Sequence, residues 1–235
     1  DNYWLNQMSF TDDSGNTLDF KGYQLYIDNY RYAERMRHVN VDKTTYRLLQ
    51  GFRGEVDDWD WEAALLYSKA KSDDITSNRV SNTLLKEALN DPTPAAYNPF
   101  SAGVNSNIER ILVDVYRKGS STLAMMDFKF SNGNFLELDA GPMGLLFGIE
   151  VRREEIVDDR DPRLDGTIQY VDYENDVYPE IGDVVNSSPT GDVSGERNTL
   201  SLFTEAQIPL AENVNAQIAL RYENMSDVED SLVSK

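Results

Sequence analysis

Cysteine is absent from this chain, and histidine occurs once, at His38. Without cysteine there is no thiol catalysis, thiolate metal site or disulfide bond, and one histidine argues against a histidine-based triad or metal site. The sequence also lacks any run of about eighteen apolar residues, so it contains no transmembrane helix. Basic residues are scarce: 22 Lys plus Arg stand against 41 Asp plus Glu, and the formal net charge is −19. Because a nucleic-acid backbone is bound by clustered cations, we expect no nucleic-acid partner.

The end of the chain instead shows a long alternation of apolar and hydrophilic residues. Within residues 213–223, one face of an extended strand carries Val214, Ala216, Ile218, Leu220 and Tyr222. A soluble sheet with one wet face would give the same pattern. The length favours another interpretation, because about ten tilted residues cross a bilayer core. The preceding segment, residues 197–210, is as long and is joined to this one by a tight turn, which predicts a membrane hairpin.

Two further hairpins share this design. Residues 44–55 and 59–68 flank a turn at Asp57-Asp58, and residues 121–130 and 145–152 flank a connection through Asn132-Gly133, where we expect the positive φ of a tight turn. Long connections, about 70–118 and 157–196, join the hairpins. Brief turns at one end and long loops at the other are typical of outer-membrane barrels. The predicted fold is all-β: an antiparallel transmembrane β-barrel fragment with long extracellular loops, whose Leu65, Phe147, Ile218 and Leu220 face lipid.

The long connections contain structure of their own. Residues 80–89 have helical spacing and predict one short loop helix, ended by Asp91-Pro92-Thr93-Pro94. We assign residues 1–235 to part of one barrel domain, with 1–41 as a loop or extracellular extension and 42–235 as hairpins and loops. Residues 12–16 predict a turn, and partial strands are expected near residues 24–35 and from Ser231 onward.

Six full strands are too few to close a barrel comfortably. An open sheet edge in lipid costs several kcal/mol for each unpaired polar group. We therefore expect the rest of the wall to come from a longer protein. An eight-stranded barrel completed by the two partial strands is the alternative.

Four short motifs, in order, resemble the barrel of TonB-dependent outer-membrane receptors. They are Asp57-Asp58-Trp59-Asp60-Trp61, Tyr97-Asn98-Pro99-Phe100, the segment 142–152 with its Gly-Ile-Glu-Val-Arg strand, and the segment 197–227 with Arg221-Tyr222-Glu223. The resemblance covers residues 40–235, the middle of such a barrel, and does not include the plug domain. It implies a barrel of about 22 strands around an N-terminal plug, in the outer membrane of a Gram-negative bacterium. The implied activity is TonB-powered uptake of a bulky nutrient, with no enzymatic step.

The same resemblance implies the partners. These are the TonB complex acting through the plug domain, outer-membrane lipid and lipopolysaccharide, and a small-molecule or oligomeric solute; a surface lipoprotein stays open. The Asn-Pro-Phe segment favours an oligosaccharide or peptide over an iron-siderophore complex. The alternatives are a soluble all-β carbohydrate-binding protein and a small outer-membrane structural barrel.

Two sets of residues are candidate ligand contacts. Tyr97, Asn98 and Phe100 would suit a sugar, because flat rings stack on C–H surfaces and amides bind hydroxyls; alternatively they anchor a loop to the barrel rim. Arg160 and Arg163 either contact the ligand or pair with neighbouring acids.

Acidic residues in the second long connection are candidate metal ligands. Asp158, Asp159 and Asp161, with Asp165 nearby, could bind calcium through carboxylate oxygens. The alternative is a solvated acidic loop, and no other cofactor is indicated. Charged residues on the hydrophilic strand faces are expected to line a lumen, where they contact solute, plug or one another: Arg47, Arg53, Glu62, Lys129, Glu150, Arg152, Arg221 and Glu223.

Overall fold

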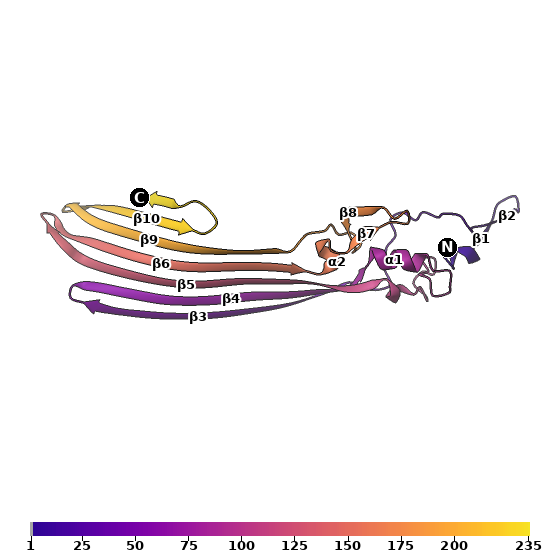
Figure 1. The fold of residues 1–235 in the computed structure, drawn as a ribbon, viewed down its shortest axis with the longest axis horizontal. Helices are drawn as coiled ribbons and strands as arrows, with labels where there is room; N and C mark the ends of the chain where they lie inside the picture. Colours follow the sequence, from indigo (N-terminus) through magenta and orange to yellow (C-terminus); the bar gives the residue numbers. More distant parts are fainter. Residues whose placement is uncertain (1) are drawn as a thin grey trace. The chain divides into compact units, whose positions relative to one another are not determined.

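A seven-stranded sheet dominates the computed structural model, which describes residues 2–235 (Figure 1). Its spatial order is β11-β10-β9-β6-β5-β4-β3, so consecutive hairpins lie side by side. The strands are β3 (His38–Val56), β4 (Trp59–Val80), β5 (Leu112–Leu138), β6 (Gly141–Arg160), β9 (Val193–Ala211), β10 (Val214–Met225) and β11 (Ser231–Ser234). The three hairpins and the late strand from Ser231 are therefore confirmed. Strands β3 and β11 form the two edges, and the sheet is not closed into a barrel within the described residues.

Tight turns join β3 to β4, β5 to β6 and β9 to β10, whereas residues 81–111 and 161–192 form long connections. The predicted short–long asymmetry is confirmed, but the second turn was misplaced. The backbone of Gly133 does not have a positive φ, and β5 continues to Leu138. The turn lies at Asp139-Ala140, where Gly141 has a φ of 128°. An Asn-Gly pair favours a turn locally, but pairing between two long strands determines where the hairpin closes.

The two faces of the sheet differ sharply in polarity. The register of β6 and β10 against β9 places Phe147 and Leu220 on the same face, both opposite Thr204. On that face lie Leu200, Leu202, Ile149, Val151, Ile218 and Tyr222, and all eight of these apolar side chains are 37% to 51% exposed. Ser201, on the other face, is 0% exposed. The apolar face is thus the open one and the polar face the shielded one, which is the reverse of a water-soluble sheet.

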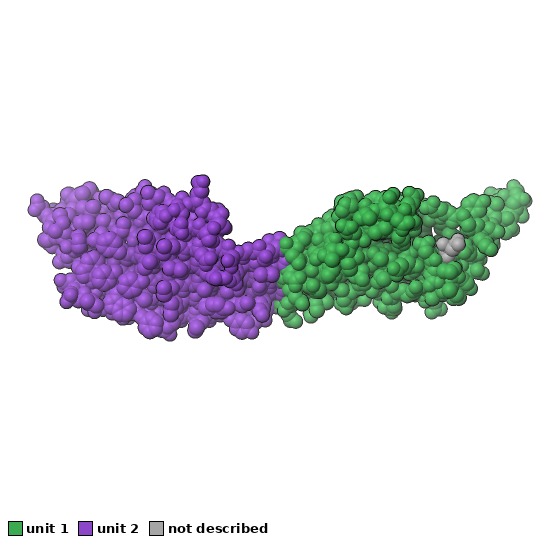
Figure 2. Space-filling model, in the orientation of Figure 1, with its two compact units in different colours: residues 1–42, 73–118, 159–192 green, residues 43–72, 119–158, 193–235 purple. Residues whose placement is uncertain are grey.

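The chain separates into two compact units (Figure 2). Unit 2, residues 43–72, 119–158 and 193–235, contains the tight turns and the exposed apolar face. Unit 1 comprises residues 1–42, 73–118 and 159–192. Its short elements are η1 (Leu5–Gln7), β1 (Ser9–Thr11), β2 (Thr17–Asp19), α1 (Asn82–Leu89), η2 (Ile108–Arg110), α2 (Pro162–Asp165), β7 (Gln169–Val171) and β8 (Val177–Gly182). Among residues 2–235, no helix is long and apolar enough to cross a membrane.

Helix α1 confirms the loop helix predicted at residues 80–89. It begins after Ser81, whose side chain accepts a hydrogen bond from the Leu84 N–H as an N-cap. The turn at residues 12–16 is also confirmed, because the Asp12 N–H donates to the Asn16 carbonyl and joins β1 to β2. The expected strand near residues 24–35 does not form. Tyr30 and Tyr32 in this segment pack their rings on the core of unit 1 instead.

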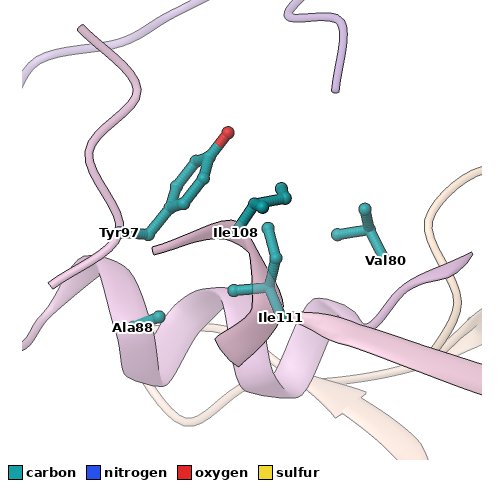
Figure 3. Close-up of a cluster of buried hydrophobic side chains, with 5 residues drawn as sticks. All are labelled: Val80, Ala88, Tyr97, Ile108 and Ile111. Carbon is teal, nitrogen blue, oxygen red and sulfur yellow. The ribbon is translucent and has the colours of Figure 1, made fainter. Parts of the chain in front are cut away.

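That core is small and lies between the long connections. Val80, Ala88, Tyr97, Ile108 and Ile111 are each at most 7% exposed, and their side chains converge above α1 and η2 (Figure 3). The loops of unit 1 are therefore a folded body with an interior of their own.

Candidate functional site

The shielded polar face of unit 2 carries a connected network of charges. The Arg221 Nε lies 2.8 Å from Glu223 Oε1, and its Nη2 lies 3.5 Å from Glu150 Oε1. Arg152 Nη1 is 3.9 Å from the same Glu150 oxygen. Ser201 Oγ donates to Glu223 at 3.1 Å and accepts from Arg221 at 3.0 Å. Four residues expected to line a lumen thus share one face and pair with one another.

An aromatic ring lies flat within this polar face. Phe203 of β9 is opposite Gly148 of β6, and a Cβ at Gly148 would come within 2.0 Å of the Phe203 ring. The guanidinium carbon of Arg221 lies 5.4 Å from the centroid of the same ring. Only glycine leaves room for this packing. The Phe203 ring covers the backbone at Gly148 on one side and contacts the Arg221 guanidinium on the other.

The opposite, apolar face ends in an aromatic cluster beside the tight turns. Trp59 follows the first turn directly and stacks on Phe130 with ring centroids 4.6 Å apart. Phe147 and Phe135 lie 6.4 and 5.9 Å from Trp59, and Trp61 stacks near Phe128 at 6.4 Å. Such a group at one end of an apolar belt matches the aromatic girdle of a membrane barrel.

In unit 1, the structure removes Tyr97 from the candidate ligand contacts. Its ring is 1% exposed in the core, so it cannot stack on a sugar. Its hydroxyl donates to Glu34 Oε1 at 3.0 Å and lies 2.9 Å from the Tyr30 hydroxyl. Burial, together with these hydrogen bonds, raises the pKa of Tyr97, and burial raises the pKa of nearby Tyr32 to about 12. Both phenols are therefore neutral structural groups, and the proposed role for Tyr97 was wrong.

Asn98 and Phe100 belong to the same anchoring turn. The Asn98 side-chain oxygen accepts the Phe100 N–H at 3.0 Å, and the Asn98 N–H donates to the Ser106 carbonyl at 2.9 Å. This geometry supports the alternative in which the segment fixes a loop. Whether either residue also contacts a ligand stays a prediction.

Arg163 pairs with an acid that sequence analysis missed. Its guanidinium donates to Asp183 Oδ2 and, at 3.2 Å, to Ser81 Oγ. Asp183 is 0% exposed and also accepts the Ser81 hydroxyl at 2.8 Å and the Thr83 N–H at 3.0 Å. Burial alone would raise the pKa of Asp183, but the hydrogen bonds from Thr83, Arg163 and Ser81 outweigh it and lower the pKa. We call Ser81, Arg163 and Asp183 the loop pin, because they join the two long connections.

The expected calcium ligands do not gather around a common point. Asp161 caps α2 and accepts the Arg163 N–H at 3.0 Å, while Asp158 is paired with Val193 across the β6–β9 ladder. Arg160 donates its backbone N–H to Asp192 at 2.8 Å. Across residues 2–235, no group of three or more His, Cys, Asp or Glu side chains could hold a metal ion. Successive strand residues point to opposite faces, which separates the neighbouring carboxylates.

Exposed aromatic rings occur elsewhere in unit 1. Tyr23, Tyr26 and Tyr173 are 72%, 86% and 60% exposed. No local pattern in the sequence distinguishes them from partly buried Tyr30 or buried Tyr97, so only the packing identifies them as available for contact.

Comparison with known proteins agrees with the geometry. The family model described as "TonB dependent receptor-like, beta-barrel" matches residues 1–234. None of the curated proteins compared with the chain matches it.

Proposed function

Since this chain belongs to the TonB-dependent receptor β-barrel family, we propose that it forms the wall and outer loops of an importer for an oligosaccharide or peptide. The family consists of TonB-powered transporters of the Gram-negative outer membrane, which carry solutes and catalyse no reaction. In the proposal, the TonB complex acts through a plug domain inside the barrel. Lipid and lipopolysaccharide cover the apolar face, and a surface lipoprotein is a further candidate partner.

The exposed apolar face of unit 2 is the observation that carries this proposal. Leu65, Phe147, Ile218 and Leu220, expected from the sequence to face lipid, are 45% to 51% exposed. In water, each exposed Å² of apolar surface forgoes about 25 cal/mol that burial would give. In hydrocarbon this cost disappears, while the charged network on the opposite face faces an aqueous lumen. The soluble carbohydrate-binding alternative would require a second layer over the apolar face.

The exposed tyrosines of unit 1 support an oligosaccharide or peptide as the solute. A phenol ring offers a flat apolar surface to a sugar or side chain, and its hydroxyl can hydrogen-bond. Tyr23 and Tyr26 provide such rings in a segment without regular secondary structure. They replace Tyr97 as the aromatic contacts of the proposal.

Neighbouring arginine substitutions test the membrane topology. Leu220→Arg places a charge on the apolar face, whereas the control Ala219→Arg places it on the polar face one residue away. An arginine near the bilayer midplane costs about 2–4 kcal/mol. We expect Leu220→Arg to reduce the heat-modifiable, membrane-assembled form strongly and Ala219→Arg to reduce it little. Equal assembly of both variants would contradict the assignment of faces.

Transport itself is tested by uptake in cells. Labelled oligosaccharide, peptide and ferric siderophore are supplied to cells expressing the protein, with and without a functional TonB complex. We expect TonB-dependent accumulation of the oligosaccharide or peptide, reduced by Tyr26→Ala and unaffected by Tyr46→Ala, an exposed tyrosine of unit 2. Accumulation of the siderophore alone would refute the proposed solute class and leave the membrane topology intact.

A further inference from the structure

Arg37 and Arg79 of unit 1 make no ion pair among residues 2–235, although acidic residues outnumber basic ones almost two to one in this chain. Arg35, Arg110 and Arg163 in the same unit each pair with a carboxylate. Within the part of the chain that the structure describes, Arg37 and Arg79 have no such partner. No carboxylate among residues 2–235 therefore pairs with either positive charge.

The backbone holds these two arginines near each other. Asn78 Nδ2 donates to the Met36 carbonyl at 2.8 Å, which ties the residue before Arg37 to the residue before Arg79. The Asn78 N–H donates to Asp114 Oδ1 at 3.2 Å, and the Arg79 Nη2 donates to the Val185 carbonyl at 3.2 Å. The two guanidinium groups lie close enough for their like charges to repel. Hydrogen bonds thus hold the backbone beside both arginines and the Arg79 guanidinium, while the two like charges oppose this arrangement.

An oxyanion is the chemical complement of two neighbouring guanidinium groups whose charges repel. An oxyanion placed between them removes the repulsion and accepts charge-assisted hydrogen bonds in the bidentate geometry that guanidinium favours. We propose that Arg37 and Arg79 form a binding site for an oxyanion, either a carboxylate or a phosphate. The ligand is a soluble anion or the phosphate of a lipid headgroup. This site does not depend on the identity of the transported solute.

Inorganic phosphate is the probe for the first test. The full chain in zwitterionic detergent is titrated with phosphate, and binding is followed by ³¹P NMR. Arg37 is exposed and its side chain makes no hydrogen bond among the described residues, so Arg37→Gln should leave the fold intact, as circular dichroism will verify. We expect Arg37→Gln to weaken binding about tenfold or more, because hydrogen bonds to charged groups contribute strongly. The matched control is Arg35→Gln, whose charge is already paired with Glu109.

Charge reversal gives an independent test. Arg37→Glu places a carboxylate beside Arg79, so we expect phosphate binding to be lost and the thermal unfolding midpoint to rise. The proposal is overturned if the unaltered chain binds phosphate without saturation. It is also overturned if Arg35→Gln weakens binding as much as Arg37→Gln, or if Arg37→Glu still binds phosphate.

Vesicles then identify the source of the anion. The chain is reconstituted into phosphatidylcholine vesicles with and without lipid A, and phosphate binding is measured again. Loss of phosphate binding in the lipid A vesicles assigns the site to a lipid headgroup. Unchanged binding assigns it to a soluble oxyanion.

Discussion

Asp183→Asn is the substitution that most directly removes the ion pair of the loop pin. Asp183→Asn keeps the shape of the side chain but removes its charge, and it leaves the Arg163 guanidinium without a counterion. Removing one partner of a buried ion pair typically costs about 3–5 kcal/mol. Asp183 is 0% exposed but the Arg163 side chain is 26% exposed, which places the expected cost near the lower limit. About 3 kcal/mol corresponds to roughly a hundredfold change in a local opening equilibrium.

Amide hydrogen exchange measures this opening where it occurs. Asp183 accepts the Thr83 N–H and Ser81 accepts the Leu84 N–H, so the first turn of α1 depends directly on the loop pin. We expect exchange of the α1 amides to be roughly a hundred times faster in Asp183→Asn. The matched control is Asp161→Asn, which removes a carboxylate charge from the same connection but keeps an N-cap for α2, and it should leave α1 unchanged. Exchange within threefold of the unaltered chain would refute the reasoning.

The pH dependence supplies a second readout of the same carboxylate. The hydrogen bonds lower the pKa of Asp183 in the folded state. Its contribution is therefore complete above the unfolded value of about 3.9 and is lost as the pH falls through the lower folded value. In the unaltered chain, protection of the α1 amides from hydrogen exchange, corrected for intrinsic exchange, should decrease when the pH is lowered beneath about 4. Asp183→Asn should show no such decrease. The double variant Asp183→Asn with Arg163→Met should recover part of the protection, because no unpaired charge remains.

Three further predictions concern the core of unit 1, the polar face of unit 2 and one partly buried acid of unit 1. Tyr97→Phe removes the hydroxyl contacts with Tyr30 and Glu34 and should destabilise the core of unit 1 by about 1–2 kcal/mol. A protease should therefore cleave unit 1 faster, and unchanged cleavage would contradict this prediction. Gly148→Ala forces the Phe203 ring away and should lower the thermal midpoint of the membrane-assembled chain, whereas Gly191→Ala, with open space around its Cα, should not. Hydrogen bonds from Thr93 and then Arg110 lower the pKa of Asp91 to about 2, which NMR titration of its carboxyl carbon would show; a value near 4 would contradict these bonds.

The strands were predictable because the alternation of their side chains depends on neighbouring residues in the sequence. Alternation with period two depends only on neighbouring residues, so the exposed face at Leu220 and the charged face at Arg221 could be assigned before any pairing was known. The helix after Ser81 was predictable for the same reason, since a capping hydroxyl and helical spacing act within one turn. The turn predicted at Asn132-Gly133 does not form, because the local preference of these two residues is weaker than the pairing of β5 with its neighbouring strands.

The burial and the pairing of side chains in unit 1 could not be predicted from local sequence patterns. Tyr97 resembles a ligand contact in sequence because flanking Asn98 and Pro99 suggest an open loop, yet its ring fills the core formed with Val80 and Ile108. Arg163 was expected to pair with adjacent aspartates but pairs with Asp183, 20 residues away. Such partners are chosen by how two long loops pack on each other, which leaves no periodic signal.

The amino-acid sequence by itself determined the strands, their two chemically opposite faces and the resemblance to a receptor family, because each depends on short-range patterns. Only the tertiary structure decided which loop residues are buried and which charges are paired. Burial removes water from Asp183 and Tyr97 and makes hydrogen-bond partners obligatory. Arg37 and Arg79, in contrast, come near each other without a carboxylate partner among the described residues. These outcomes depend on contacts between segments tens of residues apart, whose closure and packing are properties of the folded chain.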